Sequence, residues 1–467
     1  MAILKKHHLL VGSLLATVIS PPTFSQKKLS IEEALQTAVS NYGSIKAKAR
    51  YADASKASVE QARRDQLPNF NLSGQLDYGT VNGQNGPLYG FGGLGAASSG
   101  LPLPHTNWNA AFGAMYLTNV NWDFFAFGRA KEKINVASST ALRDDRDLQQ
   151  EVFQHQIKVA AAYLNLLTAQ RLTESYRKNL TRAETIRNVV ATRAKNELIA
   201  GVDSSQANAE VSNVKIALIK AVDFQQEQAN LLARLMGVTP QAFVSDTVFV
   251  TKLPASLPEE GTASLSQHPT LAFYKSRIAL SEGQIKYFRT LYMPTFTVVG
   301  ILQTRGSGFS SNYAQDQTAF THNFFEGIKP SRSNYLLGVG MTWNLTQRSR
   351  ISQQIKSQLH ISQGLQEEYD LINQQLEAQS LLSDTKLKNA LAVYHEVPVQ
   401  VKAAEEAYRQ KTVLYHNGLT NLVDVTQALY ALIRAETDRD IAYTNVWQAL
   451  LLKAAAEGDL NLFMKNL

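Results

Sequence analysis

Apolar positions along this chain follow two different spacings, and the spacing changes in the same order in each half. In residues 30–67 the apolar side chains recur every three or four positions, as on one face of a helix. In residues 70–78 and 108–122 they alternate with polar side chains, which predicts two strands that each have one apolar face. The intervening residues, 79–106, are rich in Gly, Asn, Pro and Ser and indicate a loop.

A proline-free run follows from Gly128 to Met236, and Ala, Leu, Gln, Glu, Lys and Arg dominate it. The motif around Gly201 is its evident interruption. At about 1.5 Å per residue, residues 128–195 predict a helix on the order of 100 Å long. That length far exceeds the helices of ordinary globular domains.

The same order restarts after a proline-containing connector, residues 238–266. A helix is predicted from His268 to Tyr292, and two further alternating segments predict strands. From Gln347 onward the pattern is helical to the end, and Pro398 is a candidate point for a kink or a break. The strand hairpins are therefore expected within 70–122 in the first half and 295–344 in the second.

An internal duplication explains the repeated order. Residues 417–428 repeat residues 196–207 in register, and the offset of 221 holds far outside this motif. The same frame pairs Trp122 with Trp343, Arg129 with Arg350, Ile134 with Ile355 and Gly237 with Gly458. We expect repeats at 26–237 and 267–467, with tips near 196–203 and 415–424 and with the connector in an equatorial position.

Residues 1–25 have the pattern of an export signal peptide. Lys5 and Lys6 precede a short apolar segment, and small residues stand at the −3 and −1 positions before Gln26. The alternative is an N-terminal membrane anchor, but the apolar segment is too short to span a bilayer. We therefore expect an exported protein.

The predicted strands have the features of a transmembrane β-barrel. Their apolar faces carry aromatic residues near the strand ends, as in the aromatic girdles of such barrels. Because a sheet in lipid cannot leave an edge open, and because barrels need about eight strands or more, one chain with four strands predicts an oligomer of two or three chains. Two alternatives are an ordinary antiparallel sheet packed on the helices and, for the long helices, a solenoid or bundle without a pore.

Charge and composition exclude several classes of function. Lys and Arg number 46 against 39 Asp and Glu, without a dense basic run, so we do not expect nucleic-acid binding. The chain has no cysteine, and its histidines form no metal-binding pair. Neither a nucleophile motif nor a phosphate-binding glycine loop is present. The sequence therefore predicts no catalytic residue, no cofactor and no metal site.

Two segments resemble the TolC-type outer membrane efflux protein family. Residues 122–129 resemble its junction between strand and helix, and residues 417–428 resemble its helix-tip segment. The resemblance implies a homotrimer in the outer membrane of a Gram-negative bacterium, in contact with outer membrane lipid, whose long helices extend into the periplasm as a tunnel. The fold class is then an α+β membrane protein, with a helical coiled-coil barrel continued by a transmembrane β-barrel of four strands per chain.

The resemblance also implies a function, the exit duct of a tripartite efflux system. Such a duct is passive and couples through a periplasmic adaptor (membrane fusion) protein to an inner-membrane pump of the RND, ABC or MFS type. One alternative is an exit channel for type I protein secretion. The other is an exported coiled-coil stalk or adhesin without a conduit.

By the same resemblance, the second tip narrows the tunnel. Asp424 matches a pore-constriction acid, and Tyr415 matches a tyrosine that keeps the closed state. Gln427 stands where some members have a second acid, and Thr420 stands where some have a basic residue, so a tip salt bridge to Asp203 is not expected. Asp203 is predicted to have a structural role at the first tip, as a helix N-cap, and the same role is the alternative for Asp424.

The residues predicted to contact the adaptor are apolar or small residues at the two tips. The alternative for them is packing between neighbouring coiled coils, which is compatible with adaptor contact. These residues are Leu198, Ile199, Gly418, Leu419 and Thr420.

Overall fold

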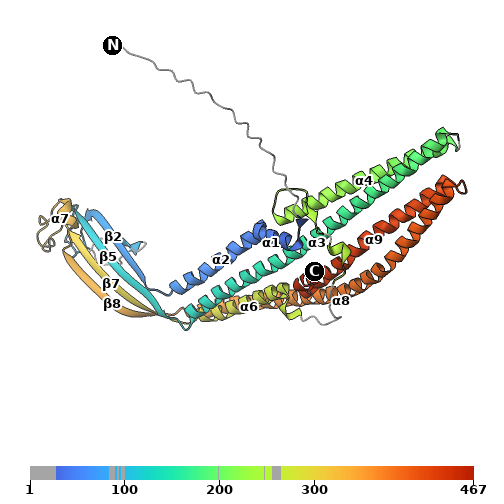
Figure 1. Ribbon diagram of the computed structural model, residues 1–467. Coiled ribbons are helices and arrows are strands. Elements are labelled where there is room, and N and C mark those ends of the chain that lie inside the picture. The colour runs from blue at the N-terminus through green and yellow to red at the C-terminus, as the bar shows by residue number, and fades with distance from the viewer. Residues whose placement is uncertain are drawn as a thin grey trace, which may run out of the picture.

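A computed structural model describes residues 28–83, 90–91, 94–95, 100–197, 199–246, 248–254 and 265–466. The predicted signal peptide lies outside these residues. The molecule is elongated, with a sheet at one end and two long helical hairpins that reach the other end (Figure 1). In the part of the chain that the structure describes, no helix is both long and apolar enough to cross a membrane.

The first half contains two short helices, two long strands and two long helices. Ser30 caps the first helix, since its Oγ accepts from Glu33 N at 3.1 Å. The helical segment predicted over 30–67 is divided into two helices at Tyr42, which leaves the helical conformation and stacks on His155 with the ring centroids 3.7 Å apart. The main elements are α1 (Ile31–Asn41), α2 (Gly43–Arg64), β2 (Asn69–Thr80), β5 (Ala110–Phe125), α3 (Arg129–Lys195) and α4 (Gly201–Met236).

The second half repeats this order. It contains α6 (Pro269–Thr290), β7 (Thr295–Ser307), β8 (Arg332–Thr342), α8 (Gln347–His416) and α9 (Leu422–Glu457). Shorter elements are β1 (Lys28–Leu29), β3 (Gly90–Phe91), β4 (Leu94–Gly95), β6 (Val244–Ser245), α5 (Val248–Thr251), a 3₁₀ turn (Leu265–Gln267), α7 (Phe324–Ile328) and α10 (Asn461–Met464).

The helix α8 does not break at Pro398, contrary to one of the two outcomes considered for that residue. Proline removes one backbone hydrogen bond and costs about 3 kcal/mol in a helix interior. The neighbouring Val397 is buried, so tertiary packing holds this part of the helix in place. Packing along a 70-residue helix therefore outweighs one unfavourable residue.

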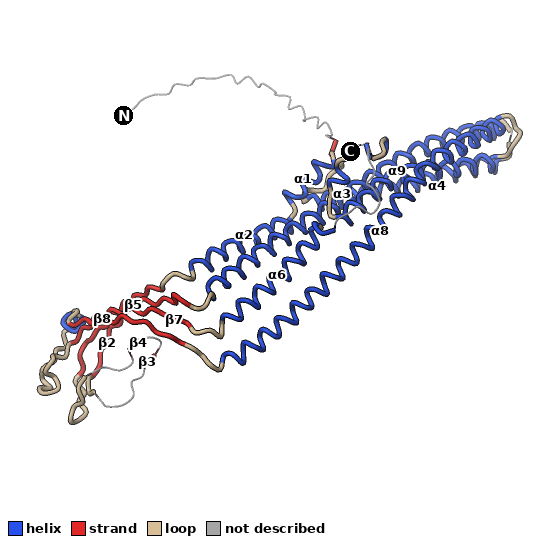
Figure 2. The backbone as a smooth tube through the Cα atoms, turned by 90° about the horizontal axis from the view of Figure 1, so that it is seen from below, coloured by secondary structure: helices blue, strands red, loops and turns tan. Residues whose placement is uncertain are grey.

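The four long strands form one antiparallel sheet in the order β2–β5–β7–β8. One row of cross-strand neighbours runs Phe70–Val120–Gly300–Leu337, and side chains on this face are largely apolar. The adjacent row begins at Asn71 and belongs to the opposite, more polar face. The sheet lies beyond the ends of the long helices instead of against them, so the alternative of a sheet packed on those helices is wrong (Figure 2).

Matching hydrogen bonds at the two strand–helix junctions support the duplication. Trp122 Nε1 donates to Gln66 O at 2.8 Å, and Trp343 Nε1 donates to Tyr292 O at 3.0 Å. Each acceptor stands two residues before the proline that ends the preceding helix. The paired tryptophans thus fix the same junction in both halves.

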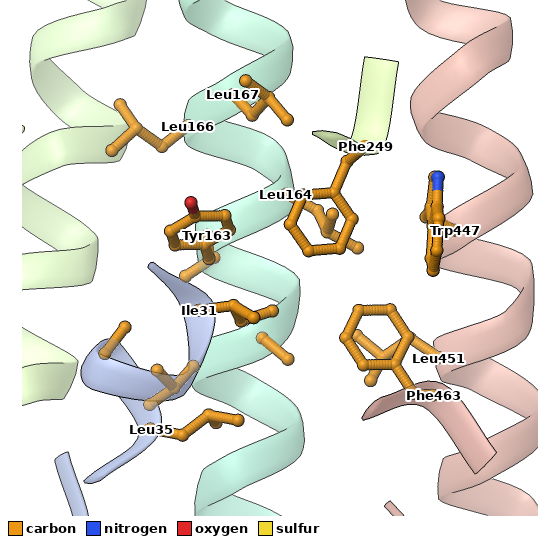
Figure 3. Close-up of a cluster of buried hydrophobic side chains, with 14 of the residues drawn as sticks. Ile31, Leu35, Tyr163, Leu164, Leu166, Leu167, Phe249, Trp447, Leu451 and Phe463 are labelled. Atoms are coloured by element: carbon orange, nitrogen blue, oxygen red, sulfur yellow. The ribbon is translucent and has the colours of Figure 1, made fainter. Parts of the chain in front are cut away.

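The main apolar core lies midway along the helices, where the connector crosses them (Figure 3). Phe249 of the connector packs edge-on against Tyr163 of α3 and Trp447 of α9. Tyr163 donates to Leu29 O at 2.7 Å and accepts from Asp246 N at 2.9 Å, and burial raises its pKa to about 12. The core therefore joins both repeats and holds the long helices at a fixed point.

Candidate functional site at the helical tips

The two helical hairpins reverse direction through equivalent left-handed residues. Glu197 has φ of 57° in the first tip, and Gly418 has φ of 73° in the second. Only glycine adopts this conformation without steric cost. The first tip therefore retains a strained residue where the second has an unstrained one.

Neither tip aspartate caps its helix, so N-capping is wrong both as the predicted role of Asp203 and as the alternative for Asp424. Asn421 caps α9, because its Oδ1 accepts from Asp424 N at 2.9 Å. In α4 the cap position is Ala200, which has no side-chain cap bond. Asp203 and Asp424 stand in the first helical turn instead, where a negative charge interacts favourably with the helix dipole.

Asp424 is paired within its own chain. Its Oδ2 lies 2.9 Å from Lys411 Nζ and accepts from Thr420 Oγ1 at 2.6 Å. The Thr420 hydrogen bond and the Lys411 charge lower the pKa of Asp424. The carboxylate is therefore ionised at neutral pH, and a cation from α8 compensates its charge.

Tyr415 is buried where the two hairpins meet. It packs with Val190 of α3, Ala207 of α4, and Leu422 and Val425 of α9. Burial raises its pKa, and its hydroxyl has no hydrogen-bond partner among the described residues. A residue that the sequence predicted at a constriction is thus part of an apolar contact between the two repeats.

Arg193, in the last turn of α3, ties the first hairpin to Tyr415. Its Nη1 donates to Tyr415 O at 2.8 Å, and its guanidinium carbon lies 5.2 Å from the centre of the Tyr415 ring. Cation–π contacts of this kind contribute about 0.5–1 kcal/mol at exposed sites. No motif in the sequence predicts a role for Arg193, although a basic side chain in the last turn of a helix is a visible signal.

The other predicted tip residues are placed as follows. Leu419 is 72% exposed, and Gln427 is also exposed. Ile199 packs against the apolar cluster around Tyr415, while Thr420 bonds Asp424. Leu198 lies outside the described residues.

Further cross-hairpin bonds lie away from the tips. Arg182 of α3 forms two hydrogen bonds with Glu436 of α9, at 2.7 and 2.8 Å, and this partner raises the pKa of Arg182. Tyr430 of α9 donates to Glu210 of α4. Together with Arg193, these contacts hold the α3–α4 hairpin against the α8–α9 hairpin.

Comparisons with known proteins agree with this geometry. Residues 34–238 match the family model described as outer membrane efflux protein. No curated protein matched the chain. The first half of the chain is therefore similar to outer membrane efflux proteins, and the resemblance to the TolC-type family is confirmed.

Solved channels share the fold at low sequence identity. The outer membrane protein VceC of Vibrio cholerae is 16% identical with a TM-score of 0.71, covering 92% of this chain and 96% of its own. CusC is 13% identical with a TM-score of 0.73 and 92% coverage of both chains. The open-state MtrE outer membrane channel of Neisseria gonorrhoeae is 15% identical with a TM-score of 0.69, covering 92% and 89%. The fold class predicted from the sequence is thereby confirmed.

Proposed function

We propose that this protein is the outer membrane exit duct of a tripartite efflux system. Three chains would close their sheets into one barrel and continue it as a helical tunnel in the periplasm of a Gram-negative bacterium. The duct has no catalytic step and no energy source of its own. A periplasmic adaptor protein would couple it to an inner-membrane pump of the RND, ABC or MFS type.

The observation that carries the proposal is the sheet. Its edge strands β2 and β8 have no partner beyond the sheet in the described chain, and it has an apolar face. A sheet in lipid must close on itself because unpaired backbone groups there cost several kcal/mol each. The long helices support the tunnel, since the 67 residues of α3 correspond to about 100 Å.

The tips are the proposed working end. Exposed Leu419 beside Gly418 forms the adaptor contact, together with Ile199 and Leu198 of the first tip. The buried Tyr415 and the Arg193 bond hold the hairpins together, which corresponds to a closed tip. Asp424 and Gln427 line the constriction. The repeats at 26–237 and 267–467 each supply one hairpin to this end.

Reconstitution in planar bilayers tests the proposal directly. The purified protein should give discrete conductance steps, because an assembled duct is a water-filled pore. A coiled-coil stalk or adhesin would give none, and that result would reject the conduit.

Deletion of the gene, followed by a susceptibility panel, tests the cargo. We expect increased susceptibility to some small toxic compounds. Unchanged susceptibility to every compound, combined with loss of a secreted protein, would favour the type I secretion channel instead.

A further inference from the structure

Two arginines face each other across neighbouring strands, at the end of the sheet far from the helices. The cross-strand register places Gln75, Met115, Arg305 and Arg332 in one row. Both arginines are exposed. Like charges directly opposite in an antiparallel pair are destabilising, so a row of this kind calls for an explanation.

The arginines lie on the polar face of the sheet. Side chains two positions apart share a face, so Arg305 lies on the face of Gln303, and Arg332 on the face of Asn334. The helix α7 packs on the other face, where Tyr116 Oη donates to Ile328 O at 3.2 Å. The polar face at this row is therefore on the opposite side of the sheet from α7.

Polar side chains, one of them acidic, stand close to the row on this face. With its amide oxygen turned toward Arg305, Gln303 accepts from Arg305 Nε and Nη2 at 3.0 Å. The acid Asp77 stands on β2, opposite Gly113, and its Oδ1 accepts from Gln75 Nε2 at 2.8 Å. Within the row, Met115 on β5 and Gln75 on β2 stand between the arginine pair and the β2 edge of the sheet.

We propose that Arg305 and Arg332 form an anion-binding belt inside the outer mouth of the duct. The inference rests on the proposed function, since a barrel with its apolar face in lipid directs the polar face to the lumen. Three chains would place six guanidinium groups at one height around the lumen. Rings of arginine favour anions, and the guanidinium fork binds phosphate and carboxylate groups with paired hydrogen bonds.

The two ends of the duct then differ in charge. At the tip, Lys411 compensates Asp424 at 2.9 Å. At the outer mouth, the row contributes two positive side chains per chain. The ionic preference of the duct is therefore set at the outer mouth, and it favours organic anions that carry phosphate or carboxylate groups.

Reversal potentials in a KCl gradient test this belt. The wild-type channel should prefer Cl⁻, and the double variant Arg305→Gln/Arg332→Gln should lower the Cl⁻/K⁺ permeability ratio severalfold, with each single variant intermediate. Lys329→Gln is the matched control, because it removes an exposed cation from the same rim but outside the strands. Pyrophosphate added on the side of the outer mouth should reduce the wild-type current and have little effect on the double variant.

The outcomes separate this inference from the proposed function. Absence of any conductance by the wild-type protein would reject the duct itself. Wild-type channels whose permeability ratio is unchanged in the double variant, or changes equally in Lys329→Gln, would reject the belt alone. Native mass measurement of each variant confirms that the compared channels have the same assembly state.

Discussion

At the scale of single residues, the partner of Asp424 decides what its charge does. The repeat motif located Asp424 at the tip, but the carboxylate is bound by Lys411 and Thr420. An unpaired ring of three aspartates would attract cations strongly. With Lys411 in place, we expect weak block by divalent cations in the wild-type channel.

Substitution of Lys411 and substitution of Asp424 should change the block by divalent cations in opposite directions. Lys411→Gln leaves Asp424 uncompensated, so the Mg²⁺ concentration for half-block should fall roughly two- to fivefold, the range of one exposed ion pair. Asp424→Asn should weaken block further and leave assembly intact. Single-channel recording with Mg²⁺ on the periplasmic side measures both.

Lys402→Gln is the control for general loss of positive charge, since Lys402 is an exposed residue of α8. Equal effects of Lys402→Gln and Lys411→Gln would mean that the pair has no specific role. Failure of Asp424→Asn to form trimers would show that Asp424 is structural and does not belong to a ring.

Residue patterns revealed the tips but not their contacts. Asp424 and Tyr415 were found because the motif recurs at a fixed offset. Arg193 and Lys411 were not, because the partner of Arg193 lies 222 residues away and the partner of Lys411 lies in the next helix, beyond the tip. The first pairing depends on how the two hairpins cross, and the second on how α8 and α9 pack within one hairpin, and no local pattern predicts either.

At the scale of elements, helix ends follow local chemistry more closely than helix interiors do. The predicted stop of the first long helix agrees with α3, which ends at Lys195. The position of the break at Tyr42 could not be predicted, because Tyr42 stacks on His155, which is distant in the sequence. Pro398 does not end α8, because packing along a helix of 70 residues outweighs the local preference of proline to end a helix.

Two buried histidines connect neighbouring helix ends. His155 Nε2 lies 2.8 Å from Leu235 O near the end of α4. His268 caps α6, with Nδ1 accepting from Thr270 N at 3.1 Å and Nε2 lying 3.2 Å from Ala455 O near the end of α9. Burial lowers the pKa of both imidazoles.

This arrangement predicts acid sensitivity. Below about pH 6.5 the unfolded chain binds protons that the folded chain does not, so the free energy of unfolding falls as pH decreases. The thermal midpoint of the wild-type protein should therefore drop between about pH 7.5 and 5.5. The drop should be smaller in the double variant His155→Gln/His268→Asn, in which the introduced asparagine retains an oxygen that can cap α6.

Charged and aromatic groups lie close to both histidines. Glu151 raises and Lys158 lowers the pKa of His155, and the Phe153 ring lies edge-on to His268. His395→Gln, at an exposed position of α8, should leave the pH dependence as in the wild type. An equal pH dependence in the double variant and the wild type would contradict the role of the buried pair.

At the scale of the whole molecule, the sequence predicted the order and type of the elements, while the arrangement of the repeats required the structure. The changes in apolar spacing and the duplication were sufficient to predict the order of elements in each half. That order is a helical segment, two strands and two long helices. They did not show that β5 and β7 join the two hairpins into one sheet or that the connector enters the shared core through Phe249. Those contacts join segments that are far apart in the sequence, and the spacing of apolar residues within one segment does not predict which other segment it contacts.

Assembly can be tested through the free edges of the sheet. The natural chain has no cysteine, so disulfides between β2 and β8 report only on introduced residues. These strands lie at opposite edges of one chain's sheet, so closure of the barrel brings β2 of one chain against β8 of the next. Ser73→Cys is combined with one cysteine at each β8 position in turn. One of these combinations should give covalent trimers. Denaturing electrophoresis without reductant measures this, with Ser73→Cys alone as the control.

Covalent dimers that exclude trimers, or no cross-link at any register, would contradict closure through these two edges. The first result would indicate pairing of like edges across a two-fold axis, as in a closed dimer. The second would indicate that β2 and β8 do not meet between chains.

The open sheet also constrains the order of events in the life of the protein. A lone chain in water has two unpaired strand edges and an apolar face, whereas its helices already share a packed core. Edges of this kind pair with any available strand and lead to aggregation. Entry into lipid solvates the apolar face but leaves the edges open, and contact between chains in water closes the edges but leaves that face exposed. Membrane insertion and barrel closure therefore have to occur together, as one step of biogenesis.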